Sequence, residues 1–144
     1  MIGVVICCHG KMGDGMRDAA EMIVGPQTQV EVVSVNPGIG GNEILQKLNT
    51  AIKGVDSGEG TLLFTDLFGG TPTNIACALL GEAQIEVVTG FNLPLLIKVL
   101  TSRDEIKDLR ELATMASEYG RRHISVAGDL LRGAGNNKSD ADKK

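Results

Sequence analysis

IGVVICC, residues 2–8, is a continuous apolar run rich in β-branched side chains, and His9 follows it directly. An apolar run without polar alternation is typical of a strand that is buried on both faces of a parallel sheet. Residues 14–24 come next and carry apolar side chains at helical spacing, until the Gly-Pro pair at 25–26 ends the pattern. The stretch therefore predicts a buried strand followed by a crossover helix, which is the start of a βαβ unit.

The rest of the chain repeats this alternation. We expect further strands at 30–35, 61–65, 85–88 and, briefly, 123–127, and further helices at 43–52 (N-capped by Asn42), 72–80 (capped by Thr71), 92–100 and 104–119. Such alternation implies right-handed βαβ units and a parallel sheet with helices on both faces. The chain length suits an α/β, flavodoxin-like, doubly wound fold with strand order 2-1-3-4, to which the short last strand adds an antiparallel edge.

The composition predicts one folded domain with a polar tail. A length of 144 residues fits a single domain, and 42% hydrophobic residues are enough for a core. We place the domain at residues 1–132 and expect residues 133–144, rich in Gly, Asn, Asp and Lys, to be a disordered tail. A net charge of −4 argues against nucleic-acid binding, which needs clustered basic side chains.

The cysteines and the apolar runs predict a soluble cytoplasmic protein. No basic leader precedes the first apolar run, and no run approaches the roughly 20 apolar residues of a membrane helix. Cys7, Cys8 and Cys77 are odd in number and two are adjacent, which is poor material for a disulfide framework. We expect all three to be small apolar core residues in a reducing compartment.

Two strand ends bring a histidine and a carboxylate together in the expected topology. In the order 2-1-3-4 the first and third strands are neighbours, so His9 and Asp66 face each other outside their carboxyl ends. A carboxylate that accepts a hydrogen bond from one ring nitrogen fixes the imidazole tautomer, and the other nitrogen is then available as a nucleophile. Gly69 and Gly70 permit close approach of the backbone, and the helix start at Thr71 supplies N–H groups that bind phosphate. These parts together predict a phosphohistidine site.

Neither a metal nor a cofactor is expected. The chain has only two histidines and no clustered ligands, which disfavours a zinc site.

Gly10, which follows His9, joins Gly69, Gly70 and Thr71 as an expected phosphate-binding residue.

Two segments resemble a known family. Residues 5–10 (VICCHG) and 65–74 (TDLFGGTPTN) look like the two signatures of the enzyme IIA domain of the mannose family (type 4) of the phosphoenolpyruvate-dependent sugar phosphotransferase system. Two positions depart from the family pattern. Cys8 stands where a hydroxyl or small residue is expected, and Leu67 stands where some members have Thr.

The resemblance implies a phosphotransferase component without a cofactor. His9 would accept a phosphoryl group from the phosphocarrier protein HPr and pass it to a separate enzyme IIB subunit during carbohydrate uptake, with Asp66 as the partner of the imidazole. The chain would associate with membrane transporter subunits only indirectly, and Phe68 could dock HPr. Family members are typically homodimers in which the last strand helps to form the subunit contact.

Other functions of this fold class fit less well. A response-regulator receiver needs an acidic cluster where this chain has Cys-Cys-His, and a flavodoxin needs a Ser/Thr-rich loop after the first strand. A small cysteine-dependent phosphatase needs an Arg six residues after Cys7 or Cys8, and neither position has one. One alternative stays open, a regulatory protein whose His9 phosphorylation state controls a partner without sugar transport.

Overall fold

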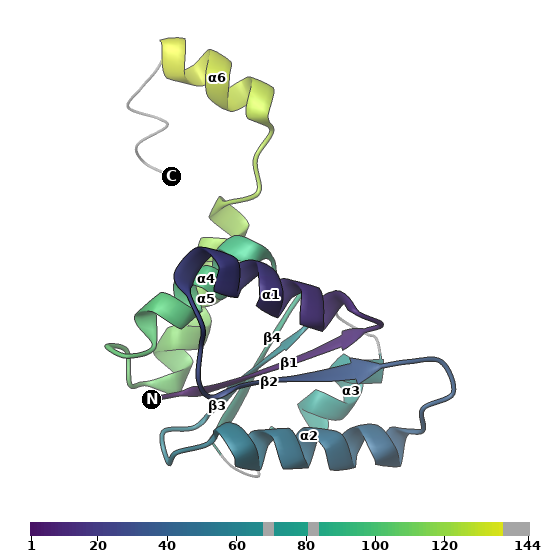
Figure 1. Ribbon diagram of the computed structural model, residues 1–144. Coiled ribbons are helices and arrows are strands. Elements are labelled where there is room, and N and C mark those ends of the chain that lie inside the picture. Colours follow the sequence, from purple (N-terminus) through teal and green to yellow (C-terminus); the bar gives the residue numbers. More distant parts are fainter. Residues whose placement is uncertain (68–70, 81–83, 137–144) are drawn as a thin grey trace.

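The computed structural model of the chain describes residues 1–67, 71–80 and 84–136. Its centre is a four-stranded parallel sheet with the order β2-β1-β3-β4 (Figure 1). The elements are β1 (Gly3–His9), α1 (Met12–Val24), β2 (Val30–Val35), α2 (Gly41–Val55), β3 (Thr61–Thr65), α3 (Thr71–Ala78), β4 (Ile85–Thr89), α4 (Leu93–Ser102), α5 (Leu109–Arg122) and α6 (Ala127–Asn136). The α/β class, the strand order and the parallel pairing predicted from the sequence are confirmed.

Alternate side chains of β1 enter two separate cores, one on each face of the sheet. Val4, Ile6 and Cys8 pack into the core under α1, α4 and α5. Val5 and Cys7 pack into the core under α2 and α3. Figure 1 shows the two helical layers on opposite sides of the strands. Because both faces of β1 are covered, residues 3–8 of the strand are apolar and buried, and the first polar residue is His9 at its exposed carboxyl end.

The strand register brings the carboxyl ends of three strands to one edge. His9 is paired with Val35, the last residue of β2, and Cys7 is paired with Thr65, the last residue of β3. Asp66 therefore leaves β3 beside the end of β1, as the topology predicted.

The short antiparallel strand predicted at 123–127 is not present, so this prediction is wrong for the described chain. Helix α5 ends at Arg122 with His123 as its C-cap, residues 124–126 have no regular structure, and α6 begins at Ala127. Ile124 and Val126 are exposed, and Figure 1 shows α6 standing away from the body of the domain. A strand exists only where a neighbouring strand supplies hydrogen bonds, and no described strand lies alongside this segment.

The tail predicted at 133–144 overlaps α6, which extends to Asn136. Residues 137–144 lie outside the described residues.

Several helices begin or end at other residues than the sequence predicted. Asn42 lies inside α2, whose N-cap is Gly40 in an extended conformation, so the Asn42 cap is wrong. The last long helix begins at Leu109 instead of 104, because the Asp108 carboxylate accepts the Glu111 N–H at 2.9 Å. Asn92 caps α4 by accepting the Leu95 N–H at 3.1 Å. Helix α3 ends at Ala78, two residues before the predicted end.

The cysteines divide two to one. Cys7 and Cys8 are buried in the sheet, as predicted, but Cys77 is exposed on α3, where the prediction of a core residue is wrong.

Among the described residues, none of the helices has the length and apolar character needed to cross a membrane.

Candidate active site

The predicted pair of His9 and Asp66 is present and hydrogen-bonded. His9 Nδ1 lies 2.8 Å from Asp66 Oδ2, and the same oxygen accepts the backbone N–H of His9 at 2.9 Å. The second oxygen, Oδ1, accepts the Leu67 N–H at 3.0 Å. The Asp66 side chain is only 8% exposed, whereas that of His9 is 50% exposed. One buried carboxylate thus holds both the backbone and the ring of a solvent-accessible histidine.

These bonds explain why the carboxyl of Asp66 is ionised. Burial alone would raise the pKa of Asp66, but the hydrogen bond from the His9 backbone, the bond and charge of the His9 ring, and the local backbone N–H outweigh it. The pKa of Asp66 is therefore lower than its ordinary value. An ionised carboxylate only accepts hydrogen bonds, so Nδ1 must carry the proton that faces it. The unprotonated nitrogen of the neutral ring is then Nε2, on the other side of the ring from Asp66.

A tight turn places His9 at the entrance of α1. Gly10 has a φ of +57°, a conformation that glycine adopts easily, and its N–H bonds the Val35 carbonyl at 2.9 Å. Helix α1 starts two residues later at Met12, and the N-cap residue Lys11 makes no side-chain capping bond. The turn fastens the end of β1 to the end of β2 and leaves the imidazole at the sheet edge.

A pocket of about 490 Å³ opens beside the imidazole. It is lined by His9, Gly10, Val35, Asn36, Pro37, Ile39, Ile44 and Thr71. The loop after β2, residues 36–39, forms one wall. No role in the site was predicted from the sequence for this loop. Because β2 is parallel to β1, its carboxyl end lies at the same edge of the sheet as that of β1. The predicted topology was therefore sufficient to place residues 36–39 beside His9.

Of the predicted phosphate-binding residues, Gly10 and Thr71 lie in the described part of the chain and line the same pocket as His9. Thr71 is exposed at the first position of α3. Gly69, Gly70 and the predicted docking residue Phe68 lie outside the described residues.

The two cysteines beside His9 are unsuited to nucleophilic chemistry. Burial raises the pKa of Cys7 and of Cys8 to about 12, and the negative charge of Asp66 adds to the effect. Both thiols are therefore protonated near neutral pH and act as small apolar side chains, as predicted. Cys8 is wholly buried directly before His9.

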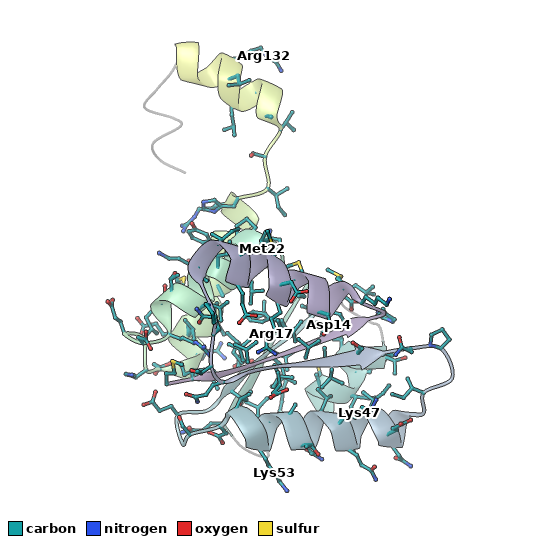
Figure 2. The ribbon with its side chains drawn as sticks, in the orientation of Figure 1. Asp14, Arg17, Met22, Lys47, Lys53 and Arg132 are labelled. Atoms are coloured by element: carbon teal, nitrogen blue, oxygen red, sulfur yellow. The ribbon has the colours of Figure 1, made fainter. Side chains whose placement is uncertain are left out.

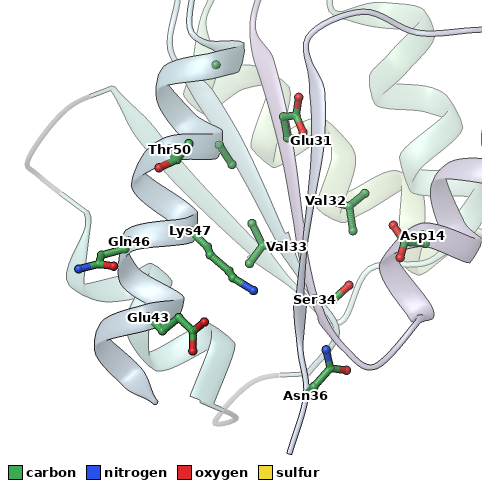
Figure 3. A pocket seen from close by; sticks show the side chains of 12 residues that line it. Asp14, Glu31, Val32, Val33, Ser34, Asn36, Glu43, Gln46, Lys47 and Thr50 are labelled. Atoms are coloured by element: carbon green, nitrogen blue, oxygen red, sulfur yellow. The ribbon is translucent and has the colours of Figure 1, made fainter. Parts of the chain in front are cut away.

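A larger hollow of about 840 Å³ lies between α1, β2 and α2 (Figure 3), and neither His9 nor Asp66 lines it. Its charged lining consists of Asp14, Glu31, Glu43 and Lys47. Figure 2 shows the outward side chains of α2, such as Lys53, and the side chain of Met22 on α1. The hollow contains no nucleophile beside a base, so the smaller pocket is the better candidate for chemistry. Within residues 1–67, 71–80 and 84–136, His, Cys, Asp and Glu form no group of three that could hold a metal ion.

Comparison with known proteins assigns the chain to a family. The family EIIA-man, described as "PTS system fructose IIA component", matches residues 3–116. This chain belongs to that family. The resemblance noted from the two signatures is confirmed.

Individual relatives agree with this assignment. This chain is 33% identical to the fructose-specific EIIA component of Bacillus subtilis over 132 residues, covering 91% of this chain and 90% of the relative. It is 32% identical to the mannose-specific EIIAB component of Escherichia coli K12, covering 87% of this chain but only 39% of that protein. A phosphotransferase EIIA component from Streptococcus agalactiae superposes with a TM-score of 0.81 at 27% identity, over 89% of this chain and 98% of the other.

Proposed function

We propose that the chain is a cytoplasmic phosphocarrier of a sugar phosphotransferase system, and that His9 Nε2 carries the phosphoryl group. The donor is phosphorylated HPr, and the acceptor is an enzyme IIB domain. The observation that carries the proposal is the 2.8 Å contact between His9 Nδ1 and Asp66 Oδ2. It leaves Nε2 as the nucleophilic nitrogen on a half-exposed ring.

The proposed transfer needs no proton to leave the ring. The Nε2 lone pair attacks the phosphorus atom on HPr, a new N–P bond forms, and the electron pair of the broken N–P bond returns to the HPr imidazole. The proton on Nδ1 stays between the ring and Asp66. With the phosphoryl group on Nε2 and the original proton still on Nδ1, the imidazole ring carries a positive charge. This charge lies beside the ionised carboxylate of Asp66. Transfer to enzyme IIB is the same displacement with His9 as the leaving group.

The pocket beside His9 supports a phosphoryl-binding role for its neighbours. Thr71 stands at the start of α3, where backbone N–H groups and the positive end of the helix favour anions. We assign the phosphoryl oxygens to the Thr71 hydroxyl and to the amides of Gly69 and Gly70. The Gly10 N–H is already bonded to the Val35 carbonyl, so Gly10 contributes only its lack of a side chain beside the imidazole. The apolar wall of Pro37 and Ile39 fits the surface of a protein donor.

The regulatory alternative uses the same histidine. No contact in the described part of the chain favours the regulatory role over phosphoryl transfer for sugar uptake. The phosphocarrier role therefore remains the proposal.

We also propose that the protein is a homodimer joined through β4 and residues 124–126. All five residues of β4 are partly exposed, whereas all five of β3 are buried. Beside β4 lies a groove of about 410 Å³ that reaches Arg110 and Arg121 on α5. The exposed apolar residues Ile124 and Val126 suit an added strand from a second copy along this edge.

The phosphocarrier proposal is tested by transfer in vitro. Wild type is mixed with phosphoenolpyruvate, enzyme I and HPr, and an acid-labile, base-stable phosphoprotein is expected. His9→Ala should lose the label, whereas His123→Ala, which removes the only other histidine, should keep it. Asp66→Asn keeps the shape but loses the charge, and should slow transfer about 10- to 100-fold.

Two outcomes would overturn the proposal. The first is unlabelled wild type beside an active HPr control. The second is labelled His9→Ala.

A further inference from the structure

Two buried threonine hydroxyls meet directly behind the His9–Asp66 pair. Thr65 is the last residue of β3 and Thr73 lies in the first turn of α3. Their exposed fractions are 0% and 1%, and their Oγ1 atoms are 2.7 Å apart. Thr73 Oγ1 also lies 2.5 Å from the Leu67 carbonyl oxygen. No role was predicted from the sequence for either residue.

The direction of these hydrogen bonds follows from counting protons. A hydroxyl has one proton to donate. The Leu67 carbonyl can only accept, so Thr73 must donate its proton there. Thr65 must therefore donate to Thr73, and the two bonds run in one direction, from Thr65 through Thr73 to Leu67. Bonds aligned in this way strengthen one another in a buried setting.

The Leu67 residue links this pair to the site. Its carbonyl is held by Thr73, and its N–H is bonded to Asp66 Oδ1 at 3.0 Å. The other oxygen of Asp66 holds His9. These hydrogen bonds, together with the backbone of Leu67 between its N–H and its carbonyl, join the buried pair to the imidazole and tie the start of α3 to the same carboxylate.

We propose that Thr73, supported by Thr65, is a positioning residue for phosphoryl transfer. It fixes the Leu67 carbonyl and thereby restrains the backbone of Leu67, so that the Leu67 N–H stays on Asp66 Oδ1 and His9 presents Nε2 to the donor. The inference deepens the phosphocarrier function proposed above and rests on it. Thr73 does not touch the reacting atoms and acts only through Leu67 and Asp66.

The first test removes the hydroxyl without changing the shape of the side chain. Thr73→Val should slow transfer from HPr about tenfold, the effect of one lost hydrogen bond on the placement of Asp66 and, through it, of the His9 nucleophile. Thr73→Ser keeps the hydroxyl and should restore the rate. Thr61→Val is the matched control, because Thr61 is fully buried in the same strand but its Oγ1 has no partner among the described residues. It should transfer at the wild-type rate.

A double variant separates positioning from stability. Replacing both partners of a buried hydrogen bond with apolar groups of similar shape is often nearly neutral for folding. Thr65→Val combined with Thr73→Val should therefore recover much of the thermal stability that Thr73→Val loses. Transfer should stay about tenfold slow, because the Leu67 carbonyl still lacks its donor. Recovery of the rate together with the stability would show a merely structural role.

The imidazole itself gives a second readout. Histidine-selective ¹⁵N labelling yields two ring systems, since the chain has only His9 and His123. In wild type at a pH where the ring is neutral, His9 should be mainly the Nδ1–H tautomer. Thr73→Val should move its ring ¹⁵N shifts toward the Nε2–H tautomer, while His123, bonded to the Tyr119 carbonyl, stays unchanged.

The outcomes distinguish the two proposals. Unlabelled wild type overturns the phosphocarrier function, and the ¹⁵N shifts still test the positioning of His9. Labelled wild type with equal rates for Thr73→Val and Thr61→Val overturns the positioning role alone, as do unchanged His9 shifts. If Thr73→Val does not fold, Thr73→Ala removes the same hydroxyl and is compared with Thr61→Ala.

Discussion

At the residue scale, one carboxylate makes three hydrogen bonds, two of them to His9. Asp66 bonds the ring, bonds the backbone N–H of the same residue, and accepts the Leu67 N–H with its second oxygen. The combination lowers the pKa of Asp66 against the effect of its burial. The carboxylate is therefore charged throughout the physiological range and can stabilise positive charge on the ring.

The lowered pKa predicts how acid affects stability. A carboxyl whose pKa is lower in the folded state than its ordinary value of 3.8 adds stability that is fully present above that value. The contribution is lost as the pH falls through the lowered pKa. Asp66→Asn should therefore be less stable than wild type by about 1–3 kcal/mol near pH 6, with the gap closing toward pH 2.

Urea unfolding of both proteins at several pH values measures this difference. A gap that stays constant or widens as the pH falls would contradict the assignment of the shift to Asp66.

At the element scale, a glycine allows α1 to pack closely against β1 and β2. Gly13 is buried in α1, and a Cβ at this position would lie 2.8 Å from Val32 Cγ1 and 3.3 Å from Ile6 Cγ2. The close contact brings the start of α1 down onto β1 and β2, just after the turn that carries His9. Gly15, two residues on, has no atom within 4 Å of such a Cβ.

The two glycines should respond oppositely to alanine. Gly13→Ala should destabilise the protein by about 1–3 kcal/mol, because the methyl group must push against two branched side chains. Gly15→Ala should stabilise it by about 0.5–1 kcal/mol, since alanine favours an exposed helix position. Chemical unfolding of both variants makes the comparison. Equal effects of the same sign would show that Gly13 is not a packing contact.

At the scale of the whole molecule, the two ends of the sheet have different tasks. The carboxyl ends carry His9 and Asp66, and the amino ends are tied by Arg103, which is fully buried. Its guanidinium donates to the Ile2 and Gln29 carbonyls at 3.2 and 3.1 Å, and Nη2 to the Thr28 carbonyl. Burial lowers the pKa of Arg103, and Asp104 opposes that shift. The charge is solvated by backbone carbonyls instead of water, which joins α4 to the loop before β2.

The proposed dimer makes a prediction at the same scale. Wild type should show about twice the 15.2 kDa chain mass at tens of micromolar by light scattering. Val126→Asp should shift the protein to monomer, because a charge opposes the pairing of an added strand. Ile23→Asp is the matched control, since Ile23 is exposed to a similar degree (61% against 66%) but lies on α1. A dimeric Val126→Asp would rule out this contact.

The sequence by itself determined the strand order and the meeting of His9 with Asp66. Both depend on patterns within single elements, the buried runs of β1 and β3, together with general rules about how parallel strands connect. The alternation of strand and helix was sufficient for the two-layered arrangement of helices around the sheet.

Only the tertiary structure decided how the site is supported. The second bond from Asp66 to the His9 backbone, the wall formed by residues 36–39, and the Thr65–Thr73 pair all join residues that are distant in sequence or separated by a turn. Thr65 and Thr61 look alike in the sequence of β3, but the Thr65 hydroxyl is bonded, whereas that of Thr61 has no partner in the part of the chain that the structure describes. The last segment failed as a strand for the same reason: whether residues 124–126 pair depends on a neighbouring edge, and a local pattern carries no information about neighbours.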